Sequence, residues 1–486
     1  MWPDHILSLV EPHLFGDAVA VRDRDGQLTY ADLGDLSARV AAAVIRAGVA
    51  EGEPVLVHAS LSRWAIVGML GVLRAGACYV PIDAAFPTAR QRQYAEASGA
   101  RVVLTEPGLP VLRPELTPIG LTTLPPGRAA RHGRLAYTCY TSGSTGTPKP
   151  VTVSAAALAY STAARLRYYQ DRVGGFLLCS SISFDSSVAG IYWTLASGGT
   201  VLIPSSRPGD LVALGRTARA NRPTHLLLVP SLYAVALRGG LADDLRTLRT
   251  VVVAGEACPP SLVGEHFARL PGTRMFNEYG PTECTVWCTV HECTPEDAGR
   301  RSVPIGHPIP GTHVALLDGV LHVSSPGLAE PDTVARTTVD GRPYYRTGDL
   351  VTQRADGALL YHGRGDDQLK LGGMRIERAE IEHALAGSPG IAYAAVGMAG
   401  GHLVGFLVTA EDTVDRQAVR RHLLDALPAA ALPAQLIQVD ELPTLPNGKV
   451  DHGDLDRRAA EAPAAQPTEG PAALTGGTLS TYPGRR

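Results

Sequence analysis

Residues 137–149 read YTCYTSGSTGTPK, an apolar run followed by a loop of hydroxyl-bearing residues and glycines that ends in Lys149. Glycines let the backbone approach a phosphate closely, hydroxyls and amides donate hydrogen bonds to its oxygens, and an ammonium offsets its charge. The stretch therefore predicts a buried strand that leads into a phosphate-binding loop.

This loop differs from the P-loop pattern G-x-x-x-x-G-K-[ST] in two respects. Pro150 stands where that pattern has Ser or Thr, and the glycine spacing does not fit. A P-loop nucleotide hydrolase is therefore disfavoured. The plain alternative is a flexible Gly/Ser loop that binds nothing, so the rest of the chain has to decide.

Lysine usage supports the phosphate-binding interpretation. Among 44 basic residues the only lysines are Lys149, Lys370 and Lys449, and arginine serves nearly every other position. A lysine kept against such a bias points to a position that needs a compact ammonium in place of a guanidinium. Compositional bias alone could also leave three lysines at random places, so the positions of the three relative to the motifs have to decide.

Outward from the loop, the chain has the pattern of an α/β protein. Residues 1–365 alternate β-branched runs with amphipathic helical patterns, which predicts a large N-terminal domain of βαβ-type subdomains. The expected strands are 55–58, 102–105, 199–203, 225–229 and 250–253, and the expected helices are 31–47 and 64–75.

A small α+β domain is expected to follow at residues 366–460. Its predicted elements are helices at 377–386 and 416–427 and strands at 394–398 and 403–408. Residues 461–486 are rich in Pro, Ala, Gly and Thr, which predicts a disordered tail.

Composition excludes several classes of partner and location. The 486 residues carry a net charge of -3, which gives no reason to expect nucleic acid or an anionic membrane surface. The apolar run 226–237 is shorter than the ~20 residues that span a bilayer, and Asp4 and His5 replace a basic signal region, so a cytoplasmic location is expected.

The cysteines predict neither disulfides nor a zinc site. Seven cysteines form no C-x-x-C pair. Cys284, Cys288, His291 and Cys293 lie close together in the sequence, but their spacings match no structural zinc pattern. We assign them to packing.

The phosphate loop resembles that of the adenylate-forming superfamily, which includes nonribosomal peptide synthetase adenylation domains, acyl-CoA synthetases and firefly luciferase. The resemblance extends over nearly the whole chain, because further segments are similar to that superfamily's motifs in the same order: residues 28–33, 73–83, 277–283, 345–350, 363–370 and 442–451.

The resemblance implies an ATP site with Mg²⁺. Attack of a carboxylate on the α-phosphate brings two anions together, so cations have to stabilise the added charge. By position, Glu283 would hold Mg²⁺, Tyr279 would stack on adenine, and Asp349 and Arg364 would hold the ribose. The full implied ATP site is Thr141, Ser142, Gly143, Ser144, Thr145, Gly146, Lys149, Gly255, Glu256, Ala257, Asn277, Tyr279, Thr282, Asp349 and Arg364.

Catalysis would involve a mobile small domain. The resemblance gives catalytic roles to Lys449, Thr282, Glu283 and Lys370. The small domain would rotate about the hinge residue Asp366, so that Lys449 serves adenylate formation and Lys370 serves thiol attack. Three departures from the family pattern are Pro150, Gly372 and a short segment at residues 317–344.

Residues 181–187, SISFDSS, resemble the segment whose aspartate binds the α-ammonium of an amino acid. A buried carboxylate at Asp185 would be left unpaired by fatty or aryl acids, which argues against an acyl- or aryl-CoA synthetase. The alternative for Asp185 is a helix N-cap. A catalytically silent nucleotide-binding homologue would be expected to lack Lys449 or Glu283, and both are present.

The substrate pocket can be carried over by position, and its lining is Asp185, Ser186, Ala189, Leu228, Val252, Ala254, Glu278, Val286, Trp287 and Lys449. Glu278 is the exception in a mostly small or apolar set. If unpaired, it would require a substrate side chain with a donor or a positive charge, as in histidine, lysine, ornithine or arginine.

L-histidine is the specific prediction, because Trp287 favours a flat ring and the pocket combination resembles pockets that activate histidine. The alternative is a Glu278 turned to solvent. The chain shows no Gly-Gly-x-Ser carrier signature. The acceptor phosphopantetheine thiol is therefore expected on a carrier protein or separate domain, and a small helper protein of the MbtH type stays an open question.

Overall fold

The computed structural model describes residues 2–141, 148–339, 341–364, 368–371, 374–409, 415–444 and 450–462. These residues form two compact units. The first comprises residues 2–86, 91–141 and 149–364, and the second comprises residues 368–462 within the described ranges, together with 87–90 and 148. The prediction of an α/β protein with a large N-terminal and a smaller C-terminal domain is confirmed.

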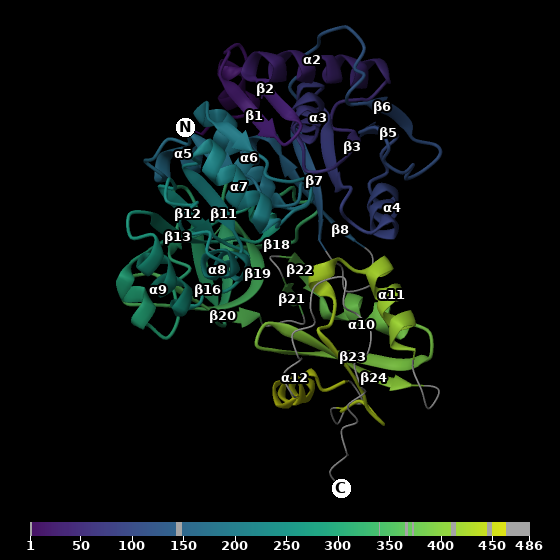
Figure 1. Ribbon diagram of the computed structural model, residues 1–486, viewed down its shortest axis with the longest axis vertical. Coiled ribbons are helices and arrows are strands. Elements are labelled where there is room, and N and C mark those ends of the chain that lie inside the picture. Colours follow the sequence, from purple (N-terminus) through teal and green to yellow (C-terminus); the bar gives the residue numbers. More distant parts are fainter. Residues whose placement is uncertain are drawn as a thin grey trace. The chain divides into compact units, whose positions relative to one another are not determined.

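The first unit contains a six-stranded sheet that carries the approach to the phosphate loop (Figure 1). Its strand order is β6 (Thr117–Gly120), β5 (Val102–Thr105), β3 (Pro54–Ala59), β4 (Cys78–Asp83), β7 (Leu135–Thr141) and β8 (Lys149–Ser154). All neighbours are parallel except β7 and β8. Helices α2 (Tyr30–Arg46) and α3 (Arg63–Arg74) pack together, and α4 (Thr88–Ala97) follows β4.

Local signals explain where α2 and α3 begin. Thr29 accepts from the backbone of Asp32, whose carboxylate accepts from the backbone of Thr29, so a capping box fixes the start of α2. At the start of α3 the Ser62 hydroxyl oxygen accepts a hydrogen bond from the backbone N–H of Ala65 at 3.3 Å, which is a simple N-cap.

A nine-stranded sheet positions most of the predicted site. Its order is β15 (His307–Pro308), β14 (Thr289–Cys293), β13 (Arg274–Tyr279), β12 (Thr250–Val253), β11 (His225–Leu228), β9 (Gly175–Leu177), β10 (Thr200–Leu202), β1 (Val19–Asp23) and β2 (Gly26–Thr29). The strands from β13 to β1 are parallel, so their carboxyl ends meet at one edge. The helices of this region are α1 (Leu7–Val10), α5 (Ala155–Tyr168), α6 (Asp185–Ser197), α7 (Leu211–Asn221), α8 (Pro230–Arg238) and α9 (Pro260–Arg269).

A third sheet of the first unit is antiparallel. It consists of β16 (His313–Leu317), β17 (Val320–Ser324), β19 (Arg342–Gln353) and β18 (Arg336–Val339), and β20 (Leu359–Arg364) also pairs with β19. In the pairing of β19 with β20, Asp349 lies opposite Arg364. This register brings two predicted ATP-site residues together.

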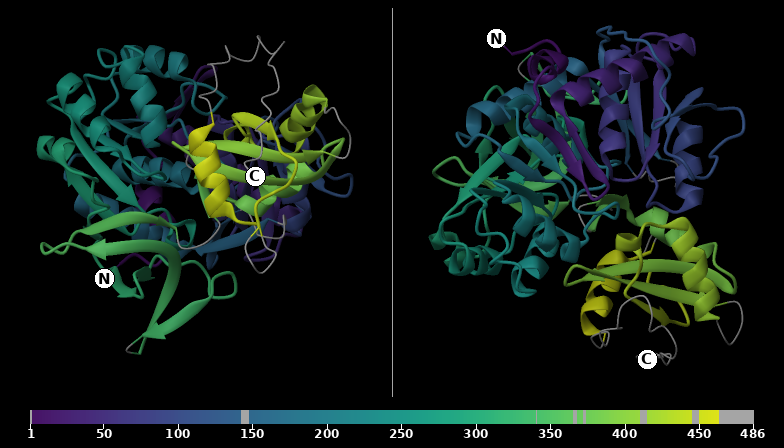
Figure 2. Two further views of the ribbon diagram at one scale, coloured as in Figure 1. Left: turned by 90° about the horizontal axis from the view of Figure 1, so that it is seen from below. Right: turned by 45° about the horizontal axis from the view of Figure 1, so that its top comes forward.

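The second unit is a small α+β assembly. It contains the hairpin of β21 (Gln368–Leu371) and β22 (Met374–Glu377), and a sheet of β23 (Ile391–Ala399), β24 (His402–Thr409) and β25 (Gln435–Gln438). Its helices are α10 (Arg378–Ala386), α11 (Arg416–Ala426) and α12 (His452–Glu461), and α12 packs against β23 (Figure 2).

Every strand and helix predicted by range is present, with ends that differ by at most three residues. The tail prediction began too early, because α12 includes Glu461. Residues 463–486 of that tail lie outside the described residues. Among the described helices, none combines the length and apolar character required to cross a bilayer.

Candidate functional site

Asp185 lies at the first position of α6, at the end of a loop that is tied to the six-stranded sheet. Asp83, at the end of β4, accepts a hydrogen bond from Ser181 Oγ and donates its backbone N–H to Ser183 Oγ at 2.9 Å. The N-cap of α6 is Phe184, so the alternative of Asp185 as an N-cap is wrong. Asp83 was assigned only to a scaffold motif, and its contacts show that it positions the loop of Asp185.

The electrostatic setting of Asp185 suits a group that receives a cation. Burial raises its pKa to about 6, although a hydrogen bond from Thr282 lowers it and the charge of Glu283 raises it further. A carboxylate whose ionised form is poorly solvated gains most from an ammonium partner. The structure therefore brings Asp185 close to Thr282 and Glu283, three residues to which the sequence gave separate roles.

The turn after Glu283 has an unusual backbone. Thr285 and Val286 have φ values of +52° and +81°, which β-branched residues rarely adopt. Contacts with α5 hold this turn, since Ser161 Oγ donates to Thr285 O at 2.8 Å and Trp287 Nε1 donates to Ser161 O at 3.3 Å. Strain of this kind persists where surrounding contacts fix it, and it commonly marks a functional site.

Glu278 lies on β13, and its carboxylate is paired inside the protein. Arg165 Nη2 donates to Glu278 Oε2 at 2.7 Å, and the Tyr169 hydroxyl donates to Oε1 at 2.7 Å. Both side chains of the ion pair are 1% exposed. Burial raises the pKa of Glu278, whereas Arg165 and Tyr169 oppose that rise.

Two expectations about Glu278 are therefore wrong. It is not an unpaired acid that awaits a donor from the substrate, and it is not turned to solvent. Arg165 was missed because no motif contains it. A signal was available, because helical spacing from Leu158 and Ser161 places Arg165 on the buried face of α5.

The remaining pocket residues come from three elements of the first unit and from the turn after Glu283. Ser186 and Ala189 lie on α6, Leu228 ends β11, Val252 lies on β12 and Ala254 follows it directly. Ala189, Leu228 and Val252 are buried, and Trp287 is buried in the same core as Ala189 and Val252. Val286 and Trp287 complete the described part of the predicted lining.

On the nucleotide side, three predicted residues form a buried cluster. The Tyr279 hydroxyl donates to Asp349 Oδ2, and Arg364 Nη1 donates to Asp349 Oδ1 at 2.9 Å. Arg364 Nη2 also donates to Thr347 O at 3.1 Å. The predicted ribose contacts of Asp349 and Arg364 would thus come from residues that already hold each other in place.

The other adenine-side residues are anchored near the end of β12 and β13. The amide of Asn277 donates to Pro304 O at 2.8 Å, and the carboxylate of Glu256 accepts from the backbone and hydroxyl of Ser231 at 3.0 and 3.1 Å. Gly255 has φ +85°, so the turn that contains Glu256 and Ala257 depends on its lack of a side chain.

Several predicted residues lie outside the described residues. These are Ser142, Gly143, Ser144, Thr145 and Gly146 of the phosphate loop, the hinge residue Asp366 and Lys449. The two ends of the phosphate loop are described, and Thr141 and Lys149 face each other across the pairing of β7 and β8. Lys370 lies on β21.

The cysteines are free and buried, as expected. His291, Cys293 and Asp297 lie close together, but Asp297 accepts from His291 at 2.8 Å and from Arg300 at 2.6 Å. It also belongs to the capping box that begins at Thr294. These contacts assign the cluster to local structure.

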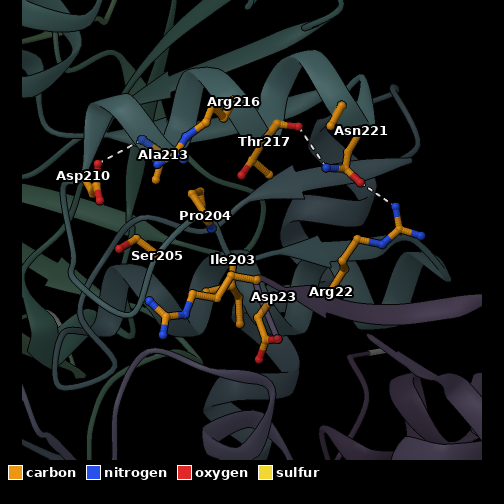
Figure 3. Close-up of a pocket in the computed structure, with 12 residues that line it drawn as sticks. Arg22, Asp23, Ile203, Pro204, Ser205, Asp210, Ala213, Arg216, Thr217 and Asn221 are labelled. Carbon is orange, nitrogen blue, oxygen red and sulfur yellow. Dashed lines mark hydrogen bonds between the residues drawn. The ribbon is translucent and has the colours of Figure 1, made fainter. Parts of the chain in front are cut away.

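A separate pocket of about 450 Å³ opens between β1, the residues after β10 and α7, and it contains none of the predicted site residues (Figure 3). Arg22 Nη1 donates to Asn221 Oδ1, and Asp210 caps α7 by accepting from Ala213 N at 2.9 Å. Its polar side chains thus have structural tasks, and we assign it no role.

Known proteins share this architecture. Residues 11–328 match the family described as AMP-binding enzyme, and residues 380–449 match the AMP-binding enzyme C-terminal domain. The chain superposes on holo-PA1221, an NRPS protein containing adenylation and PCP domains, with a TM-score of 0.81 and 26% identity over 94% of this chain and 84% of that one. The amide bond synthetase McbA from Marinactinospora thermotolerans has the same fold, with a TM-score of 0.82 at 24% identity over 93% and 99% of the two chains.

Two curated relatives are peptide or antimetabolite synthetases. The AMB antimetabolite synthetase AmbB of Pseudomonas aeruginosa is 36% identical over 93% of this chain and 39% of its own length. The phosphinothricin tripeptide synthetase PhsC of Streptomyces viridochromogenes is 35% identical over 93% of this chain and 44% of its own length. The chain spans less than half of either relative. It belongs to the AMP-binding enzymes, the adenylate-forming ligases, and its relatives include nonribosomal peptide synthetases.

Proposed function

We propose that this enzyme activates an amino acid with ATP. The substrate carboxylate attacks the α-phosphorus, and a bond forms between a carboxylate oxygen and this phosphorus. The bond between the α-phosphorus and the oxygen that bridges to the β-phosphate breaks, so pyrophosphate leaves with that oxygen and its electron pair. The observation that carries the proposal is Asp185, whose raised pKa and loop contacts suit an α-ammonium. Fatty and aryl acids offer no such partner, which makes an acyl- or aryl-CoA synthetase the weaker alternative.

Glu283 fits the predicted Mg²⁺ site. Its carboxylate is a hard oxygen ligand, and its side chain is buried beside Thr282 and near Asp185. When bound, Mg²⁺ would neutralise phosphate charge. Thr282 would hold the α-phosphate, and Tyr279, Asp349 and Arg364 would hold the nucleoside.

We further propose that the aminoacyl group passes to the phosphopantetheine thiol of a carrier protein. The thiol sulfur would attack the acyl carbon, and AMP would leave. Support comes from PA1221, which contains adenylation and PCP domains, and from relatives that are peptide synthetases. Lys449 would act in the first step and Lys370 in the second, after rotation about Asp366. A helper protein of the MbtH type stays a hypothesis.

We propose L-histidine as the specific substrate, bound with a neutral imidazole. The resemblance of the pocket combination to pockets that activate histidine still supports it. The guanidinium of Arg165 covers one face of the Trp287 ring, since its central carbon lies 4.2 Å from the ring centroid. However, Arg165 already pairs with Glu278, so the imidazole should bind in its neutral form.

A pyrophosphate-exchange panel over the amino acids tests the proposal, with hydroxylamine trapping of the adenylate as a second readout. We expect exchange with one small group of amino acids and none with fatty or aryl acids. Activity with acids that lack an α-ammonium, and none with amino acids, would favour the acyl-CoA synthetase alternative.

Two lysine variants test the division of labour. Lys449→Ala should lose most adenylation and keep ATP binding and thermal stability near wild type, because its ammonium acts on transition-state charge. Lys370→Ala should spare exchange and slow transfer to a carrier thiol. Equal losses in both half-reactions would contradict the two-state hinge.

A further inference from the structure

Arg165 is a buried arginine that uses only part of its hydrogen-bonding capacity. One nitrogen, Nη2, donates to Glu278, while Nε and Nη1 have no hydrogen-bond partner among the described residues. The side chain is 1% exposed. A buried charged donor without a partner costs free energy, so such a group in a native site points to a ligand.

The guanidinium lies against the predicted pocket lining. Its central carbon is 4.2 Å from the centroid of the Trp287 ring, and its Nη2 contacts Glu278. Both partners belong to the lining carried over by position. The charge of Arg165 also reaches Asp185, whose pKa it lowers. The guanidinium therefore contacts the part of the predicted lining formed by Glu278 and Trp287 and lies within electrostatic range of Asp185.

The balance of buried charges then restricts the charge that the substrate side chain can carry. Arg165 and Glu278 neutralise each other, and Asp185 neutralises the α-ammonium of a bound amino acid. A cationic side chain would add an uncompensated charge beside the guanidinium in a buried site, which is costly. A neutral side chain with an acceptor atom would instead satisfy the free donors of Arg165.

We propose that Arg165 is a specificity-determining residue that selects a neutral, hydrogen-bond-accepting side chain and rejects cationic ones. This inference rests on the proposed amino-acid activation. It excludes lysine, ornithine and arginine, which the sequence had left open beside histidine. Neutral imidazole meets the requirement through its unprotonated nitrogen, and carboxamide side chains meet it through their oxygen.

The experiment compares kcat/KM in pyrophosphate exchange for L-histidine, L-glutamine, L-lysine and L-ornithine. Wild type should prefer the neutral acceptors over both cations. Arg165→Met removes the guanidinium and leaves Glu278 without its cation, so the ratio of lysine or ornithine to the neutral acceptors should rise by about tenfold or more. Arg167→Met is the matched control, since it removes an exposed charge from the same helix and should leave the ratio unchanged.

A second variant guards against misfolding of the first. Arg165→Met combined with Glu278→Gln removes both charges and leaves no uncompensated buried ion. It should lose the preference for acceptor side chains without a gain for lysine. Retention of the wild-type ratios in either folded variant, or a wild type that prefers a cationic amino acid, would overturn the proposal. Exchange with no amino acid at all would count against the proposed function as well, whereas exchange with unchanged ratios would count against Arg165 alone.

Discussion

Strand β13 separates two clusters of the same composition. Glu278 and Tyr279 are consecutive, so their side chains point to opposite faces of the sheet. On one face a glutamate meets Arg165 and Tyr169, and on the other Tyr279 meets Asp349 and Arg364. Each cluster contains a carboxylate, an arginine and a tyrosine.

The clusters differ in how they are assembled and in what they leave available. Asp349 and Arg364 face each other in adjacent strands, and both Nη atoms of Arg364 have protein acceptors. Arg165 and Glu278 are 113 residues apart, and two nitrogens of Arg165 have no hydrogen-bond partner among the described residues. We infer that the first cluster is a rigid support for a ligand common to the family, whereas the second is open to a variable ligand.

The largest effect on activity is expected from a change at Asp185, in the predicted amino-acid pocket. Asp185→Asn removes the partner of the α-ammonium, so kcat/KM for the amino acid should fall by about 100-fold or more, while the KM for ATP changes little. Steady-state exchange with each substrate varied checks this. Asp332→Asn, at an exposed position, is the control.

The same variant should gain stability. The folded-state pKa of Asp185 is raised to about 6, so its ionised form destabilises the fold above that pH, and the cost is absent at low pH. At pH 7.5 the Asn variant should therefore have a free energy of unfolding that is higher by up to about 2 kcal/mol, and it should unfold at a higher temperature. Loss of stability at that pH would make Asp185 a structural residue.

A smaller effect is expected from a change at Asp349, in the predicted nucleotide site. Asp349→Asn keeps the shape of the side chain but removes the charge that pairs with Arg364, so the KM for ATP should rise by about tenfold. Amino-acid selectivity should stay as in wild type, because this cluster lies on the other face of β13. A shift in selectivity without a change in the KM for ATP would contradict the separation of the two faces.

The pH dependence of kcat/KM should report the ionisation of Asp185. Only ionised Asp185 can pair with the α-ammonium, and its pKa is about 6, so kcat/KM for a substrate with a non-titrating side chain should fall as the pH drops through about 6. One unit below that pKa the loss is about tenfold. A profile that stays flat down to pH 5 would show that another group limits binding.

The smallest effects are expected from the two tyrosines, which form a matched pair. Tyr169→Phe and Tyr279→Phe each remove one hydroxyl that donates to a carboxylate, a change of about 1 kcal/mol or a few-fold in rate. Tyr169→Phe should alter amino-acid selectivity, and Tyr279→Phe should alter the KM for ATP. Identical effects of the two changes on both quantities would remove the distinction between the clusters.

The residues of the predicted nucleotide site show how much sequence motifs alone can predict. Asp349 lies in the segment 345–350 and Arg364 in the segment 363–370, and both were predicted with Tyr279 from the family resemblance. The βαβ pattern also gave the main strands, since alternation and helical spacing are local properties of the chain. The lysine bias singled out Lys149, Lys370 and Lys449 without any structural information.

The pocket side shows what the sequence left undecided. The sequence supplied Glu278 and its position in the lining, but the meaning of a buried acid depends on its neighbours, and burial without a partner differs from burial beside a guanidinium by several kcal/mol. Asp83 is a similar case, because its contacts with Ser181 and Ser183 join the end of β4 to the loop before α6.

The sequence alone therefore determined the family and the fold class and predicted the residues of the ATP site, because those depend on motifs and on periodicities of neighbouring residues. Only the tertiary structure decided that Glu278, a predicted pocket residue, is paired with Arg165. Arg165 on α5 and Glu278 on β13 are 113 residues apart and meet through a side-chain hydrogen bond, and no local pattern encodes that approach. Electrostatic complementarity in a buried site is a property of residues brought together by packing, so it became visible only once the helix and the strand were in place.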